Sequence, residues 1–271
     1  GQAGEGIYGV LTGVVEGVII EGIPTGHGRV TTTDIFGNWT EVETINEYDT
    51  TLIEEHGVIK VSSSTTSIKD SYNVDGSQLV QTVDAETAYL YESIEIGRIG
   101  IILYVDNLVP GEVRTVDIFG NATTTKTTNT YDDALLELGM VKVKTATTRI
   151  TAIGYYPDPD NIDLENPEQG YTPGVLLDGT NLVQVQDSQI TYHYEDPTVD
   201  GNTPGKLTRV EETAAGKVRS VDLFGNATTT QTVTTYDNTP GGLVKRFGIV
   251  KPLTVTTEIT DVGYYSDTSN I

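Results

Sequence analysis

The chain has 271 residues, no Cys and a formal net charge of −23 at pH 7. This charge argues against binding to nucleic acid or to an anionic membrane surface, because no basic patch is available to neutralise phosphates. The lack of Cys excludes disulfides, thiolate catalysis and Cys-ligated zinc. An acidic, cysteine-free, Thr-rich β chain suits the exterior of a bacterial cell.

The chain opens with an apolar run, "GIYGVLTGVVEGVII" at 6–20, that is too short to span a bilayer and lacks the basic start of a signal peptide. Thr, Val, Ile, Tyr and Gly are abundant throughout, which favours strands joined by tight turns. We therefore predict an all-β fold. Its antiparallel hairpin modules would stack end to end, either as sandwich-like units or as an open β-spiral.

One sequence unit recurs along the chain. "DIFGN" occupies 34–38 and 117–121, "DLFGN" occupies 222–226, and each leads through a polar, mostly Thr-rich strand to Tyr-Asp. After a loop of variable length, related segments follow at 57–68, 139–150 and 248–259. We divide the chain into the tail of a unit at 1–27, a first unit at 28–110, a second at 111–216 with an acidic insertion near 157–174, and the start of a third at 217–271.

The five-residue motif predicts a corner of the backbone. Its Asp can accept local backbone N–H groups, Gly-Asn tolerates positive φ, and the Phe is expected to face inward as a core anchor. The residues assigned to this structural turn and core are Asp34, Phe36, Gly37, Asn38, Asp117, Phe119, Gly120, Asn121, Asp222, Phe224, Gly225 and Asn226.

The segments "GRVTTTDIFGN", "GEVRTVDIFGN" and "GKVRSVDLFGN", each followed by a strand and "YD", resemble RHS/YD repeats. That resemblance implies a bacterial extracellular protein whose hairpins coil into an extended sheet or a hollow toxin shell. The units here are much longer than YD repeats. The Tyr that precedes the motif Asp in the family is replaced by Thr33, Val116 and Val221.

Candidate chemistry is sparse. His27, His56 and His193 lie in different phases of the repeat with no partner at ligand spacing, so a metal triad is not expected. Carboxylates are numerous enough that a glycosidase pair stays open. The one clustered set is Asp158, Asp160, Asp163 and Glu165, which can be interpreted as a calcium loop or as a solvated insertion.

Two further patterns allow two interpretations each. The pairs Tyr155/Tyr156 and Tyr264/Tyr265 could stack on sugar, or could place one ring in the core and one at an edge. Asn38, Asn121 and Asn226 each begin an Asn-x-Thr sequence. They are therefore either glycosylation acceptors or simply the residue that the turn requires.

Three functional interpretations follow: a structural or assembly protein, a surface adhesin or carbohydrate-binding module that would meet surface glycans, and an enzyme. The chain repeats one unit and shows no single cluster of polar residues of the kind that an active site needs, which favours the structural protein. We therefore expect no catalysis and no required cofactor. The motif aspartates are 83 and 105 residues apart, and a second copy starting directly after Ile271 would give 83 again. We therefore expect copies or consecutive blocks to join head to tail as an extracellular filament, with an RHS/YD-type toxin shell as a further alternative.

Overall fold

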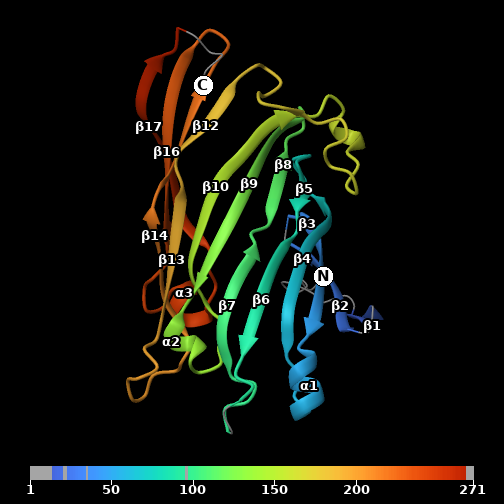
Figure 1. Cartoon of the computed structure of the whole chain (residues 1–271). Coiled ribbons are helices and arrows are strands. Elements are labelled where there is room, and N and C mark those ends of the chain that lie inside the picture. Colours follow the sequence, from blue (N-terminus) through green and yellow to red (C-terminus); the bar gives the residue numbers. More distant parts are fainter. Residues whose placement is uncertain (1–13, 21–22, 35, 95–96, 267–271) are drawn as a thin grey trace, which may run out of the picture.

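The computed structural model describes residues 14–20, 23–34, 36–94 and 97–266. Over these residues the protein is mostly β, in three antiparallel sheets of which none is closed. The strands run side by side along the molecule, with β1 and β17 on opposite sides (Figure 1). The all-β prediction is confirmed at this level.

Each sheet is a set of antiparallel neighbours. The first has the order β1 (Val14–Ile20), β2 (Ile23–Thr33), β3 (Trp39–Tyr48), β4 (Val61–Tyr72), β6 (Ala85–Tyr91) and β7 (Ile102–Val109). The second has the order β14 (Leu207–Ala214), β13 (Ser188–Tyr194), β10 (Val143–Tyr155), β9 (Asn121–Tyr131), β8 (Glu112–Val116) and β5 (Gln78–Val83), and β11 (Thr172–Pro173) pairs with β10. The third has the order β12 (Asn181–Gln186), β15 (Gly216–Val221), β16 (Asn226–Tyr236) and β17 (Pro252–Tyr264).

The hairpins β3–β4, β9–β10 and β16–β17 have the same register. In each hairpin the pairing skips one residue near the end that adjoins the five-residue motif, namely Lys69, Thr151 and Thr260. It skips another near the opposite end, namely Ser62, Lys144 and Leu253. Such β-bulges twist and bend a strand locally. A bulge at matched positions means that the three hairpins bend in the same way.

The five-residue motif forms the corner that joins β2 to β3, β8 to β9 and β15 to β16. At the second copy, the Oδ1 atom of Asp117 accepts the N–H groups of Phe119 at 2.8 Å and Asn121 at 2.9 Å. The Asn121 side chain donates to Asp117 Oδ2 at 2.9 Å. The other two copies have the same three bonds, and Gly37, Gly120 and Gly225 have φ of 92°, 88° and 85°. The hydrogen bond from the Asn226 side chain lowers the pKa of Asp222.

The prediction that the motif Phe anchors the core is wrong. Phe36, Phe119 and Phe224 are 74%, 66% and 79% exposed. The physical reason is the turn itself, because the Asp side chain binds the Phe N–H and fixes that residue at the outer bend. Burial of large apolar residues is a one-way rule, and exposed ones are common at surfaces.

Three short helices follow the Tyr-Asp pairs, where the sequence indicated only loops of variable length. They are α1 (Thr50–His56), α2 (Asp133–Leu136) and α3 (Leu243–Phe247). Asp49 and Asp132 cap the first two by accepting the N–H groups of Leu52 and Leu135. Each helix buries apolar side chains: Leu52 on α1, Leu135 and Leu136 on α2, and Val244 on α3. The helices lie at one end of the sheets, and the loop carrying the single-turn helix η1 (Pro159–Asn161) lies at the other (Figure 1).

Candidate functional site

The outer edge of β4, which faces away from β3, is covered by the turn and the bent strand β5–β6 that follow it. Ser63–Thr66 pair with Ala85–Ala88 of β6. Beyond that stretch, side chains replace the ladder: Gln81 Oε1 accepts the Ile68 N–H at 3.1 Å, and Ser71 Oγ exchanges two hydrogen bonds with the backbone of Leu79. Only Asp84 separates β5 from β6, so one bent strand passes from the second sheet to the first.

The outer edge of β10 is covered by the same device. Thr145–Thr148 pair with β13, and Gln184 Oε1 accepts the Ile150 N–H at 3.2 Å. Only Asp187 separates β12 from β13. Beyond this point β11 pairs with Gly154 and Tyr155. Both β4 and β10 therefore have hydrogen-bond partners along their inner and outer edges.

The outer edge of β17, the third strand of this kind, is open within the described residues. Its inner edge pairs with β16, and no second strand pairs with it there. Ile153 on β10 is 6% exposed, whereas Val262, at the matching position of β17, is 70% exposed. Each of the 13 residues of β17 is exposed.

Two further groups next to β17 differ from their counterparts in the same way. A Cβ atom on Gly154 would collide with the carbonyl oxygen of Thr172, whereas one on Gly263 would meet no described atom within 4 Å. The side-chain oxygens of Asn38 and Asn121 accept the backbone N–H groups of Val74 and Leu177, each at 2.8 Å. Among the described residues, no donor reaches the matching oxygen of Asn226.

These observations define the candidate site as the outer edge of β17 together with the Asn226 side-chain oxygen. The Ile68 and Ile150 N–H groups point outward, so the equivalent Ile259 is expected to do the same. Because N–H groups alternate sides along a strand, Thr257 and Val255 should also point outward. An unpaired row of N–H and C=O groups is a template for adding another strand.

The acidic insertion of the second unit folds back onto the second sheet through Arg114. This buried side chain donates to Thr124 Oγ1 at 3.0 Å and to the Pro167 carbonyl at 3.0 Å, and it pairs with Glu168 at 2.8 Å. Its guanidinium also stacks over the Tyr171 ring at 3.5 Å. The insertion is thus held in place by a buried cation.

The four residues of the predicted calcium loop are exposed. Two of them, Asp158 and Asp163, form hydrogen bonds to nearby residues of the same loop. Asp158 accepts the Asn161 side chain at 2.9 Å, and Asp163 accepts the N–H groups of Glu165 and Asn166. Across the described ranges, no three His, Asp or Glu side chains gather closely enough to hold a metal ion. Calcium binding by Asp158, Asp160, Asp163 and Glu165 stays a prediction.

A polar groove of about 740 Å³ lies between the first hairpin and the insertion. At its wall the buried Glu43 binds His27 at 2.6 Å, Arg29 at 2.9 Å and Lys69 at 3.0 Å. Burial by itself would raise the pKa of Glu43, but these hydrogen bonds lower it to about 2. The carboxyl is therefore ionised at neutral pH and holds no proton for acid catalysis.

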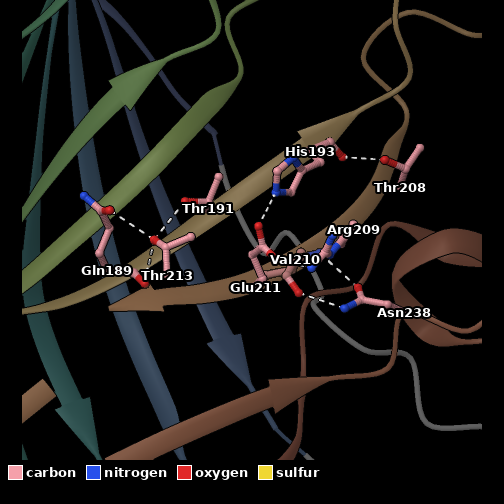
Figure 2. A network of polar contacts seen from close by, with 9 residues as sticks. All are labelled: Gln189, Thr191, His193, Thr208, Arg209, Val210, Glu211, Thr213 and Asn238. Carbon is pink, nitrogen blue, oxygen red and sulfur yellow. Dashed lines mark hydrogen bonds and ion pairs between the residues drawn. The ribbon is translucent and has the colours of Figure 1, made fainter. Parts of the chain in front are cut away.

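The three histidines lie in separate surroundings. His27 contacts Glu43, and His56 contacts the Ser93 carbonyl at 2.9 Å. Figure 2 shows the third, His193, beside Glu211 at 2.9 Å. In the same view, the Asn238 side chain donates to the Val210 carbonyl and accepts its N–H, which ties the loop before α3 to β14.

The four residues of the tyrosine pairs differ in exposure, and only Tyr156 lies in the core. Tyr156 is buried and Tyr155 half-buried, while Tyr264 is exposed and Tyr265 half-buried. The candidate glycosylation residues Asn38, Asn121 and Asn226 each use the side-chain nitrogen as a donor to the motif Asp. Glycosylation there stays a prediction.

Sequence reasoning missed the covering strands β5–β6 and β12–β13. Their turns and first strands read "VDGSQLVQ" at 74–81 and "LDGTNLVQ" at 177–184, a second repeated motif that direct alignment could have found. It also missed Arg114 as a buried residue. The signal was available in "VRTVD" and "VRSVD", where an Arg recurs among alternating apolar positions.

Comparison of the chain with models of protein families, with curated proteins and with solved structures gives no match. The resemblance to RHS/YD repeats therefore stays a prediction from the sequence. Among the described helices, none has the length and apolar composition needed to cross a bilayer.

Proposed function

We propose that this chain is a structural building block of an extracellular filament or surface fibre, in which hairpin units stack edge to edge and β17 is the joint with the next unit. The observation that carries the proposal is the open outer edge of β17. The equivalent strands β4 and β10 have that edge covered, and β17 does not within the described residues.

The shape of the joint supports this function. A long exposed edge strand invites pairing with other chains, and proteins that stay monomeric usually protect such edges with charge, proline or a bulge near the middle. The stretch of β17 that matches the covered part of β10 is Thr254–Thr257, which carries no charge. The acidic surface and the absence of Cys support an extracellular setting.

The test is to block the edge without breaking the hairpin. In Val255→Pro the lost N–H points outward, so the ladder with β16 is kept, because proline is tolerated on the solvent side of an edge strand. Val255→Thr is the matched control, since it keeps both the N–H and the β-branched shape. Each protein is examined by sedimentation velocity over a range of concentrations and by electron microscopy.

We expect the unmodified chain and Val255→Thr to form elongated assemblies that grow with concentration, and Val255→Pro to stay monomeric with an unchanged far-ultraviolet spectrum. A chain that remains monomeric at high concentration would contradict the self-assembly proposal. So would Val255→Pro assembling as the unmodified chain does.

A further inference from the structure

The two covering strands, β5–β6 and β12–β13, dock through the same three contacts, and these contacts define a recognition chemistry. Each covering strand is preceded by a turn that reads hydrophobe-Asp-Gly, at 74–76 and 177–179. Each carries a Gln five residues after that Gly, namely Gln81 and Gln184. Because the two instances agree in sequence and in geometry, the contacts are a rule of this fold and not a local accident.

The first contact joins this turn to the corner motif. The N–H of Val74 donates to Asn38 Oδ1, and the N–H of Leu177 donates to Asn121 Oδ1, both at 2.8 Å. In each corner the other end of the Asn side chain is held by the motif Asp. The Asn side-chain oxygen is therefore already oriented when the covering strand docks, which lowers the entropic cost of docking.

The second contact closes the point where the backbone ladder is interrupted. The side-chain oxygen of Gln81 accepts the Ile68 N–H, and its nitrogen donates to the Val83 carbonyl. Gln184 does the same with Ile150 and Gln186. A residue without an amide at this position would leave a strand N–H without its partner, which costs free energy when the edge is covered.

The third contact is steric. Gly76 and Gly179 both have φ of +82°, and a Cβ atom on either would collide with the side chain that follows the next motif Asp, Ile118 or Leu223. The Gly of this turn therefore permits both the positive φ and the close approach of the next copy of the five-residue motif.

The third corner presents the same acceptors. Its backbone bond from Asp222 N–H to Asn226 is 3.0 Å, against 2.9 Å at Asp117, and Gly225 has φ of 85°. Asn226 Oδ1 and the Ile259 N–H thus stand where Asn121 Oδ1 and the Ile150 N–H stand in the second unit. Over the described residues, no covering strand binds Asn226 Oδ1 or the Ile259 N–H.

We infer that β17 receives a bent β-strand that follows a turn reading hydrophobe-Asp-Gly and carries Gln five residues after the Gly, with the turn N–H binding Asn226 and the Gln binding Ile259. The inference rests on the proposed role of β17 as a joint and names the partner chemistry of that joint. Residues 1–20 contain no Asp-Gly pair. If two copies paired head to tail through residues 1–20, they would form the backbone ladder without these contacts. A strand that carries the Asp-Gly turn and the Gln therefore binds β17 more tightly than residues 1–20 do.

The probe is a fluorescein-labelled peptide of residues 176–194, which contains the turn, β12 and β13. Its binding to the intact chain is followed by fluorescence anisotropy. A Gln184→Ala peptide is the matched control and cannot affect the fold of the protein. Asn226→Ala and Val255→Pro test the protein side, and Asn38→Ala is a control because that side chain is already engaged by Val74.

We expect the unmodified peptide to bind, the Gln184→Ala peptide and the Asn226→Ala protein each to weaken binding about five- to tenfold, as for one lost hydrogen bond, and Val255→Pro to abolish it. Asn38→Ala should leave binding unchanged. Equal affinity of the two peptides would overturn the inference.

The outcome separates this inference from the proposed function. If the chain assembles in a manner sensitive to Val255→Pro but the peptide neither binds nor dissolves the assemblies, the inference fails and the proposed function stands. If the peptide binds in a Gln184-dependent manner while the chain alone stays monomeric, the inference stands and self-assembly fails.

Discussion

The N–H of Tyr156 donates a 2.8 Å hydrogen bond to the carbonyl oxygen of Gly120, and the carbonyl oxygen of Tyr156 lies only 2.1 Å from the position that a Cβ atom on Gly120 would take. The third unit repeats the relationship between Tyr265 and Gly225, with a hydrogen bond of 2.7 Å. The corner is therefore locked against the end of the returning strand. A side chain at this glycine faces both an unfavourable φ and a backbone collision.

Gly120→Ala should destabilise the protein by about 3 kcal/mol or more, because the strained φ and the overlap with backbone act together. Gly139→Ala is the control: its φ is +77°, but a Cβ atom there would meet nothing within 4 Å. That change should cost only about 1 kcal/mol. Urea unfolding of both variants measures the difference, and equal losses would refute the locked corner.

Phe119→Ala should cost less than about 1 kcal/mol, because the ring is mostly exposed. Leu135→Ala, which empties a buried site under α2, should cost about 2–5 kcal/mol. The comparison uses thermal and urea unfolding under the same conditions. A loss at Phe119 as large as that at Leu135 would show that the ring is buried in the molecule in solution.

Arg114→Lys should destabilise the second unit by about 3 kcal/mol, because a lysine cannot make the forked contacts to Thr124, Pro167 and Glu168 from a buried position. Arg219→Lys is the matched control. Its side chain is 30% exposed, against 4% for Arg114, and no insertion packs on it within the described residues.

Limited proteolysis gives a second readout for the same pair. We expect Arg114→Lys to speed cleavage within 157–170, and Arg219→Lys to leave that rate unchanged. If both variants cleave at the rate of the unmodified chain, the insertion is held by something other than Arg114.

Glu43 should make stability depend on pH in the acid range. Hydrogen bonds from Lys69, His27 and Arg29 outweigh the effect of burial and lower its pKa from 4.5 to about 2 in the folded protein. The folded state therefore binds fewer protons than the unfolded chain between these values. The resulting stabilisation is complete above about pH 4.5 and is lost as the pH falls through about 2.

Glu43→Gln should lower the free energy of unfolding by about 2 kcal/mol near neutral pH, since Arg29 and Lys69 lose a buried counter-charge. It should also flatten the dependence of stability on pH between about 4.5 and 2. Glu41→Gln, on a more exposed side chain, is the control and should change little. Unfolding at about pH 6 and pH 3 tests both, and an unchanged slope in Glu43→Gln would refute the assignment.

The sequence predicted the parts of the fold that local chemistry decides. Thr alternation indicated the strands, and the Asp and Gly of the corner motif behave as turn chemistry requires. The direction of the Phe ring was not predictable in this way, because it depends on how the Asp side chain fixes the bend. The covering strands were not predicted because the acidic insertion lengthens the chain between the five-residue motif and the second copy of "DG…LVQ". The two copies therefore do not align with the motif.

The most direct test of the account is hydrogen exchange at the outward N–H groups of β17 in a sample that has assembled. We predict that Val255, Thr257 and Ile259 exchange as slowly as Thr66 and Ile68, whose outer edge is covered by the bent strand β5–β6. Diluting the sample until the assemblies dissociate should release the β17 amides and leave those of β4 protected. Fast exchange at Val255, Thr257 and Ile259 within intact assemblies would contradict the claim that this edge is the joint.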